Sequence, residues 1–243
     1  MSGAYSAIFY SRQLGGSAAS SKIVVPHILA QVPAKSVVDI GCGTGVWLNE
    51  FQRHGVDDYL GIDGEYVPEQ VRKIPAERFM SADLRRLKRL ERTFDLACCL
   101  EVAEHLPPEN AAGFVQFLAS AAPVVLFSAA VPHQGGVEHV NEQNASYWAR
   151  LFAMHGKQPY DCLRPLIWNN RQVEWWYRQN MIIYASPGIM PPELAPVSDI
   201  SRLDYIHPEM LDQMMRRYEN FGAGIKVVYN SLKALGSSAL RSR

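Results

Sequence analysis

The architecture of this chain follows from one stretch, Val37-Val38-Asp39-Ile40-Gly41-Cys42-Gly43-Thr44-Gly45. A short apolar run reaches an acid, and three glycines follow at alternate positions. Glycine allows positive φ and lets a ligand approach the backbone without a Cβ in the way. A strand, a glycine-rich turn and a helix beginning at Val46 form the arrangement in which α/β proteins bind nucleotides, at the carboxyl end of a parallel sheet. The stretch therefore predicts a ligand pocket where the first strand of a sheet ends.

Strand and helix signals alternate through most of the remaining chain. Strands are predicted at residues 36–40, 59–62, 78–82, 94–100, 124–130, 158–163 and 181–185. Helices are predicted at residues 21–31, with Ser20 or Ser21 as the cap, and at 46–54, 108–121 and 144–155. This repetition predicts an α/β protein with a doubly wound, mostly parallel, seven-stranded sheet.

Three regions are expected along the chain. Residues 1–20 are rich in Ser, Gly and Ala and read as an N-terminal arm that docks over the ligand. Residues 21–186 form the sheet domain, which carries an aromatic insert at 164–180. Prolines then mark a linker, so residues 187–243 read as a linker and a helical extension, with helices at 208–221 and 225–235. The extension is a candidate homodimer contact.

The composition of the chain limits the classes of function. Among 243 residues, 24 Lys and Arg balance 24 Asp and Glu, which argues against nucleic-acid binding through bulk charge. The four cysteines show no Cys-x-x-Cys metal spacing. No stretch resembles a signal peptide, and no apolar run approaches the ~20 residues of a membrane span. We expect a cytoplasmic protein without a membrane partner.

The spacing of the glycines narrows the ligand. The phosphate-binding fingerprint places its third glycine one residue later than Gly45, and no basic side chain follows here. Asp-x-Gly-x-Gly-x-Gly instead resembles motif I of class I S-adenosylmethionine-dependent methyltransferases, over roughly residues 20–185. The resemblance implies that S-adenosylmethionine is the cofactor. The predicted cofactor contacts are Asp39, Gly41, Cys42, Gly43, Gly45, Asp63, Gly64, Asp83, Leu84 and Glu101.

Acids at the ends of successive strands support this interpretation. Asp39, Asp63, Asp83 and Glu101 close the four strands in turn. A carboxylate about 20 residues after the glycine loop, where Asp63 stands, accepts ribose hydroxyls in nucleotide-binding sheets. In the resembled family the acid at the position of Asp83 meets the adenine amino group.

Residues that follow the fourth predicted strand are candidate metal ligands. Glu101, Glu104 and His105 have the i, i+3, i+4 spacing that brings side chains onto one helical face. Carboxylates and an imidazole suit a divalent cation such as Mg²⁺. The pattern looks like that of metal-dependent O-methyltransferases of small-RNA 3′ ends and of ubiquinone biosynthesis. Those families carry a further His before an aromatic helix, which His139 matches better than His133.

A mechanism without metal stays open on the same residues. Glu-Val-x-Glu-His-Leu also occurs in metal-independent members of the broad family. A positioned histidine, His105, His133 or His139, then takes the proton of the acceptor hydroxyl. Glu101, His105, His133 and His139 are therefore the catalytic candidates. Both schemes favour an oxygen acceptor, and neither excludes nitrogen.

The aromatic insert has two interpretations. Two structures are open for the aromatic residues, a pocket wall for a ring and an anion or a hydrophobic cluster of the core. The residues concerned are Trp148, Trp168, Trp175, Trp176 and Tyr177, together with Arg164, Arg171 and Arg178. The insert also looks like that of a bacterial methyltransferase group of surface-sugar and natural-product pathways. The basic run at residues 85–92 reads as a solvated face.

Three functions compete on this evidence. The leading hypothesis is S-adenosylmethionine-dependent O-methylation of a small-molecule hydroxyl, on a saccharide or a natural product. The second is 2′-O-methylation of RNA ribose, which the zero net charge disfavours. The third is a cofactor-binding partner subunit without activity, which would not need the intact glycine loop, acids and histidines.

Overall fold

The computed structural model describes residues 7–219, 221, 222 and 224, with side chains from residue 15 onward. The chain divides into two compact units, residues 1–205 and 206–243. Among the described residues of the second unit, 208–219 form a helix and 221, 222 and 224 are also helical, which confirms the first of the two predicted C-terminal helices. The predicted helix at 225–235 lies outside the described residues. None of the described helices combines the length and the hydropathy that a membrane span requires.

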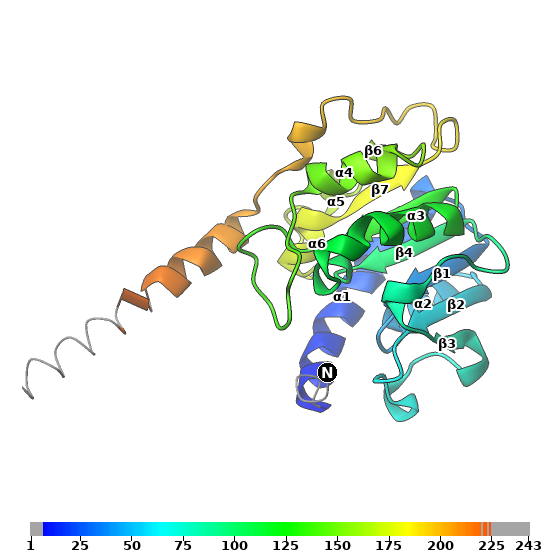
Figure 1. Cartoon of the computed structure of the whole chain (residues 1–243), viewed down its shortest axis with the longest axis horizontal. Helices are drawn as coiled ribbons and strands as arrows, with labels where there is room; N and C mark the ends of the chain where they lie inside the picture. The colour runs from blue at the N-terminus through cyan, green and yellow to red at the C-terminus, as the bar shows by residue number, and fades with distance from the viewer. Residues whose placement is uncertain (1–6, 220, 223, 225–243) are drawn as a thin grey trace, which may run out of the picture. The chain divides into compact units, whose positions relative to one another are not determined.

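A seven-stranded sheet forms the centre of the first unit, as predicted (Figure 1). The strands lie in the order β3-β2-β1-β4-β5-β7-β6. The first five are parallel to one another, and β7 is antiparallel to both β5 and β6. The strands are β1 Ser36–Ile40, β2 Asp58–Asp63, β3 Phe79–Ser81, β4 Leu96–Leu100, β5 Val124–Ser128, β6 Gln158–Tyr160 and β7 Ile182–Ala185. The strand order reverses between β1 and β4, where α/β sheets open a crevice for ligands.

Helices cover both faces of this sheet. The α-helices are α1 Ala7–Gln31, α2 Val46–Arg53, α3 Ala111–Ala121, α4 Ala145–Ala153, α5 Arg164–Ile167 and α6 Trp175–Asn180. Apolar side chains of α1, α2, α5 and α6 pack in one core cluster, and those of α3 and α4 pack in the other. Short 3-10 turns are η1 Glu69–Val71, η2 Ala76–Arg78, η3 Leu84–Arg86, η4 Ala103–His105, η5 Pro108–Asn110 and η6 Ile200–Leu203.

The N-terminal helix is longer than the sequence indicates. A helix was expected from residue 21 with a serine cap, but α1 begins at Ala7 and runs unbroken, as the blue helix in Figure 1 shows. The Ser20 hydroxyl bonds to the carbonyl of Gly16 one turn earlier and accepts the amide of Glu174 at 3.0 Å. The serine is thus a mid-helix contact to the segment before α6 and not a cap, because tertiary packing outweighs its weak helix propensity.

The aromatic insert is mostly part of the core. Arg164 is buried and forms a bidentate ion pair with Asp161, and its Nη1 donates to the carbonyls of Gln179 and Leu203. Arg178 is also buried and donates to the carbonyl of Trp168. The interpretation of these two arginines as anion-binding groups is therefore wrong, because both are used to satisfy backbone carbonyls inside the unit.

Candidate functional site

The glycine loop connects β1 to α2 and is shaped by left-handed backbone. Gly41 has φ 80° and Gly43 has φ 53°. A Cβ at Gly41 would lie 2.3 Å from Val102 Cγ2, so this position has room only for glycine. A Cβ at Gly43 would meet no atom within 4 Å. Since Gly43 lines the pocket described next, the space over its Cα is available to a ligand.

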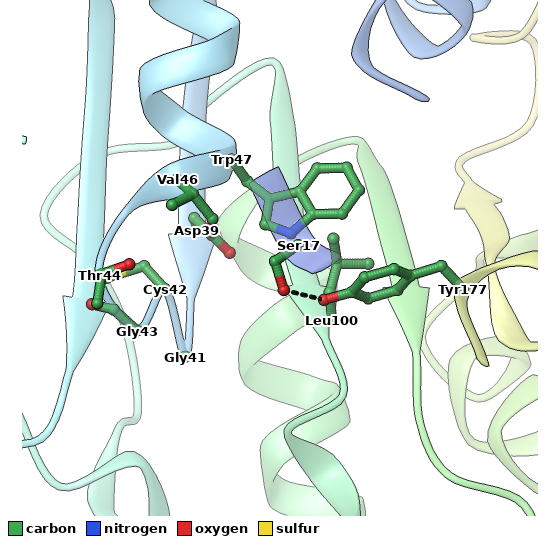
Figure 2. Close-up of a pocket in the computed structure, with 10 residues that line it drawn as sticks. All are labelled: Ser17, Asp39, Gly41, Cys42, Gly43, Thr44, Val46, Trp47, Leu100 and Tyr177. Carbon is green, nitrogen blue, oxygen red and sulfur yellow. Dashed lines mark hydrogen bonds between the residues drawn. The ribbon is translucent and has the colours of Figure 1, made fainter. Parts of the chain in front are cut away.

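A pocket opens over this loop and is shown in Figure 2. It encloses about 480 Å³, including space open to solvent. The lining residues are Ser17, Asp39, Gly41, Cys42, Gly43, Thr44, Val46, Trp47, Leu100 and Tyr177. The pocket thus lies where the predicted crevice between β1 and β4 was expected, and α1 and α6 each add one side chain to its wall.

Asp39 is the only ionisable carboxyl among the described residues that line this pocket. It is 2% exposed, and it forms no hydrogen bond or ion pair with any residue that the structure describes. Burial, and then the charge of Asp63, raise the pKa of Asp39 to about 8. A buried acid without a protein partner is costly, and a cationic ligand in the pocket would relieve that cost.

Asp63, at the end of β2, supports the glycine loop from behind. Its carboxylate accepts the amide of Gly43 at 2.6 Å, the amide of Gly64 at 2.7 Å and the hydroxyl of Tyr66. Burial raises the pKa of Asp63, and these three hydrogen bonds partly lower it. The predicted cofactor residues Asp63 and Gly64 are therefore joined to the loop through Gly43.

Asp83, at the end of β3, is already paired. Its carboxylate accepts Nε and Nη2 of Arg85 at 2.8 Å each, and it caps the turn η3. The hydrogen bonds from Arg85 lower the pKa of Asp83 to about 2. Leu84 beside it is buried. A ligand that contacts Asp83 must therefore share the carboxylate with Arg85.

Three of the four predicted metal ligands converge after β4. Glu104, His105 and His139 each offer a ligand atom within 4.8 Å of the others. The rings of His105 and His139 lie edge to face, with 4.9 Å between their centroids. Glu104 and His105 come from η4, while His139 comes from the loop 131–142 after β5. Burial, and then the charge of His139, lower the pKa of His105 to about 4.

Glu104 is an orphaned buried acid. It is 0% exposed, and neither carboxylate oxygen has a hydrogen-bond partner of good geometry among the described residues. Burial, and then the charge of Glu101, raise its pKa well above the usual value. Buried polar groups in folded proteins are nearly always satisfied, so this exception indicates a missing partner such as a cation or a proton.

Glu101 does not join this group. Its backbone is left-handed, with φ 56°, and η4 spans only residues 103–105, so the predicted common helical face with Glu104 is wrong. Its carboxylate instead accepts Gln134 Nε2 at 2.8 Å and Asn180 Nδ2 at 3.1 Å. Burial raises the pKa of Glu101, and these amides partly lower it. Glu101 thus follows the pocket residue Leu100 in the chain, and its carboxylate is bonded to Gln134 and Asn180.

His133 also lies outside the group of three. Its side chain is exposed, and its backbone amide donates to Glu142 Oε2 at 2.9 Å. Its φ of 72° places it in a tight turn at the start of the loop 131–142. Among the three histidines proposed as bases, the structure groups His105 and His139 and leaves His133 apart.

Sequence reasoning missed several lining residues, above all Ser17, and it offered Tyr177 only as one of several aromatic residues of a candidate pocket wall. These two side chains share a hydrogen bond of 3.0 Å across 160 positions of sequence (Figure 2). Trp47 contacts the Tyr177 ring edge on, with 5.2 Å between the centroids. Burial raises the pKa of Tyr177 to about 12, so the phenol stays neutral. The aromatic clustering of the insert was a signal for Tyr177, whereas no local pattern marks Ser17.

Replacing Ser17 with Ala is expected to loosen the pocket wall. The lost hydrogen bond leaves the Tyr177 hydroxyl short of one partner, a cost of about 1 kcal/mol. We expect ligand dissociation from the pocket to become about fivefold faster, measured by stopped-flow fluorescence. Ser21→Ala is the matched control, because that buried serine of the same helix bonds to the carbonyl of Ala18 within its own helix. Equal rates in both variants would contradict a role for Ser17 in the wall.

Comparisons with known proteins agree with this fold. The profile of a family described as a methyltransferase domain matches residues 21–179. Over 85 residues the chain is 34% identical to a ubiquinone biosynthesis O-methyltransferase of Hahella chejuensis, an alignment that covers 32% of this chain and 35% of that protein. The chain therefore spans about a third of the length of this curated relative.

Solved structures show the same architecture. The sugar N-methyltransferase KedS8 of Streptoalloteichus sp. superposes with a TM-score of 0.56 at 18% identity, covering 76% of this chain and 97% of that one. DesVI of Streptomyces venezuelae superposes with a TM-score of 0.54 at 15% identity, covering 74% and 95%. At these identities the likeness concerns the fold alone. The family profile covers more than half of the chain, so the chain belongs to the methyltransferase domain family, as its glycine motif and strand-end acids predicted.

Proposed function

We propose that this protein transfers a methyl group from S-adenosylmethionine to a hydroxyl group of a small molecule. The observation that carries the proposal is Asp39, a buried carboxyl in the wall of the glycine-loop pocket that has no partner in the part of the chain that the structure describes. S-adenosylmethionine carries an ammonium and a sulfonium, and a cation is the partner that this acid lacks. When bound, the cofactor supplies an electrophilic methyl group to an incoming nucleophile.

The pocket residues would bind and shield the cofactor. Gly43 leaves open space over its backbone, which suits the close approach of a ligand. Asp63 is held beside the loop and would accept the ribose hydroxyls. Asp83 follows the next strand and would meet the adenine, as the family resemblance implies. Ser17 and Tyr177 close the wall opposite the loop and would keep water from the reacting groups.

Glu104, His105 and His139 would act on the acceptor. A hydroxyl is a poor nucleophile until it loses its proton. His105 and His139 each engage Nδ1 with an acceptor, the carbonyl of Glu138 and the carboxylate of Glu142 respectively. Each ring then presents Nε2 as the nitrogen with a lone pair, which suits a general base or a metal ligand.

The donor set also fits a divalent cation. Glu104, His105 and His139 would hold it, and Glu104 would gain the partner that it lacks among the described residues. One carboxylate and two imidazoles are a softer set than the all-oxygen sets typical of Mg²⁺, so Mn²⁺ or Zn²⁺ fits at least as well as the Mg²⁺ first considered. A bound cation lowers the pKa of a coordinated hydroxyl.

The acceptor class rests on relatives and on charge. The name of the Hahella chejuensis relative describes O-methylation in ubiquinone biosynthesis, although only 85 residues align. The zero net charge of the chain disfavours RNA as the acceptor. A small-molecule hydroxyl, on a saccharide or a natural product, is therefore the acceptor that we propose.

Calorimetry with S-adenosylmethionine tests the first half of this proposal. We expect one site per chain in the wild type and a loss of about 2 kcal/mol of binding energy, or ~30-fold, in Asp63→Ala. Turnover with a panel of sugar and aromatic hydroxyl acceptors, before and after chelation, tests the second half. Wild-type protein that binds no S-adenosylmethionine would overturn the proposal.

A further inference from the structure

The carboxylate of Glu142 forms several hydrogen bonds close to the proposed site, although Glu142 has no part in the proposed function. It belongs to the loop 131–142 that carries His139, and its carboxylate receives three hydrogen bonds from within that loop. The amide of His133 donates to Oε2 at 2.9 Å, and the amide of Gly135 donates to Oε1 at 2.7 Å. His139 Nδ1 lies 2.9 Å from the same Oε1. One carboxylate therefore fixes both the start of the loop and its histidine.

The loop needs such an anchor because its backbone is strained. His133 and Glu138 have φ of 72° and 59°, although neither is glycine. Left-handed backbone at such residues is strained and persists only where surrounding contacts enforce it. The amides of His133 and Gly135, which bind Glu142, belong to the left-handed part of the loop. The carboxylate thus supports the loop conformation in which His139 lies beside Glu104 and His105.

Glu142 also decides which nitrogen of His139 carries the proton. An ionised carboxylate only accepts hydrogen bonds, so Nδ1 must be the protonated nitrogen and Nε2 keeps its lone pair. In metal sites and in general-base histidines, a carboxylate in this position fixes ring orientation and tautomer. The contact at 2.9 Å therefore serves either role that His139 has in the proposed function.

Gly136 restrains the ring from another direction. A Cβ at this position would lie 2.2 Å from His139 Nε2 and 2.4 Å from Cε1. Its backbone does not fall in the left-handed region, and the atoms nearest to an added Cβ all belong to the ring, so alanine here would force the ring to shift. The imidazole is thus held between a carboxylate and the backbone of its own loop.

We propose that Glu142 is a positioning residue that holds the His139 ring in the Nδ1–H tautomer and directs Nε2 to the group formed with Glu104 and His105. How His139 is held is independent of the proposed function, and only the use of Nε2 rests on it. Glu142 itself touches no reacting atom, so it acts through His139.

The test combines a spectroscopic and a binding measurement on the full chain. In ¹⁵N-histidine-labelled protein, at a pH where the ring is neutral, His139 is expected as the Nδ1–H tautomer, with its signals assigned by their loss in His139→Gln. Glu142→Gln should move His139 toward the Nε2–H form. It should also weaken Mn²⁺ binding, followed by electron paramagnetic resonance, by 10- to 100-fold. Glu109→Gln, an exposed acid outside the loop 131–142, should change neither.

Two further outcomes complete the test. Gly136→Ala displaces the ring without touching Glu142 and should weaken Mn²⁺ binding to a similar degree, which covers the case in which Glu142→Gln fails to fold. An Nε2–H tautomer in the wild type, or an unchanged tautomer in folded Glu142→Gln, would overturn the proposal. Absence of Mn²⁺ binding in the wild type would count against the cation in the proposed function, and the tautomer measurement would still decide the role of Glu142.

Discussion

Replacing Asp39 with Asn is expected to weaken S-adenosylmethionine binding by at least ~30-fold, or about 2 kcal/mol, because it removes the one carboxyl of the pocket wall. The geometry of Asn is close to that of Asp, so the loss reports the charge rather than the shape. Isothermal titration calorimetry measures it directly. Asp57→Asn is the matched control, since Asp57 is exposed and lies outside the pocket. Equal affinity in Asp39→Asn and the wild type would remove the basis for a cationic ligand.

The same substitution is expected to stabilise the protein in the absence of ligand. The pKa of Asp39 is raised from 3.8 to about 8 by burial and by Asp63, so between these values the folded state holds a proton that the unfolded state has released. The free energy of unfolding of the wild type therefore falls as the pH rises from about 4 to about 8. Asn lacks this titration, and at pH 8 we expect Asp39→Asn to be more stable by on the order of 3 kcal/mol.

Urea denaturation at pH 4, 6 and 8 checks this expectation. The advantage of Asp39→Asn should be small at pH 4 and should grow toward pH 8. It should stay below the full value of the pKa shift, because the buried amide of Asn also lacks a partner. A variant that is less stable than the wild type at pH 8 would show that Asp39 has a protein partner that compensates its charge.

Replacing Glu104 with Gln is expected to lower kcat by about 10²-fold or more while S-adenosylmethionine affinity changes less than twofold. The pocket lining does not include Glu104, so cofactor binding should persist. The lost carboxylate is the buried, unpartnered group beside His105 and His139, so the acceptor side of the site should fail. Turnover with the best acceptor of the panel, together with calorimetry, measures both effects.

Glu109→Gln is the control for this experiment, because Glu109 follows the same stretch and is exposed. Thorough removal of metal from the wild type then separates the two mechanisms. A loss as large as that of Glu104→Gln indicates a cation, and full activity indicates a histidine base. Wild-type turnover by Glu104→Gln would show that the group of three has no part in the reaction.

Most of the sheet could be predicted because its signals are local. The apolar run at Val37–Ile40 and the acids that follow successive strands mark both the strands and the edge at which they end. A parallel sheet brings those ends together whatever the connections are, so the glycine loop and Asp63 had to meet. The same reasoning placed Glu104 and His105 near His139, since β4 and β5 are neighbours.

The other features of the fold and of the site depend on contacts between residues far apart in the sequence, which no local pattern encodes. The start of α1 at Ala7 precedes a Gly-Gly-Ser stretch of weak helix propensity, and the bond of Ser17 with Tyr177 joins residues 160 positions apart. Glu101 has left-handed backbone and lies outside the turn η4, so it does not share the helical face with Glu104 that the i, i+3 spacing predicted. Arg164 resembles an anion-binding group in sequence, and only the folded chain shows the backbone carbonyls that it satisfies.

A crystal structure with S-adenosylhomocysteine would show where the cofactor lies. We expect the amino acid part of the ligand in the pocket over Gly43, with its ammonium on the carboxylate of Asp39 and its sulfur on the side that faces Glu104, His105 and His139. A ligand bound elsewhere, or a sulfur turned away from these three side chains, would contradict this expectation.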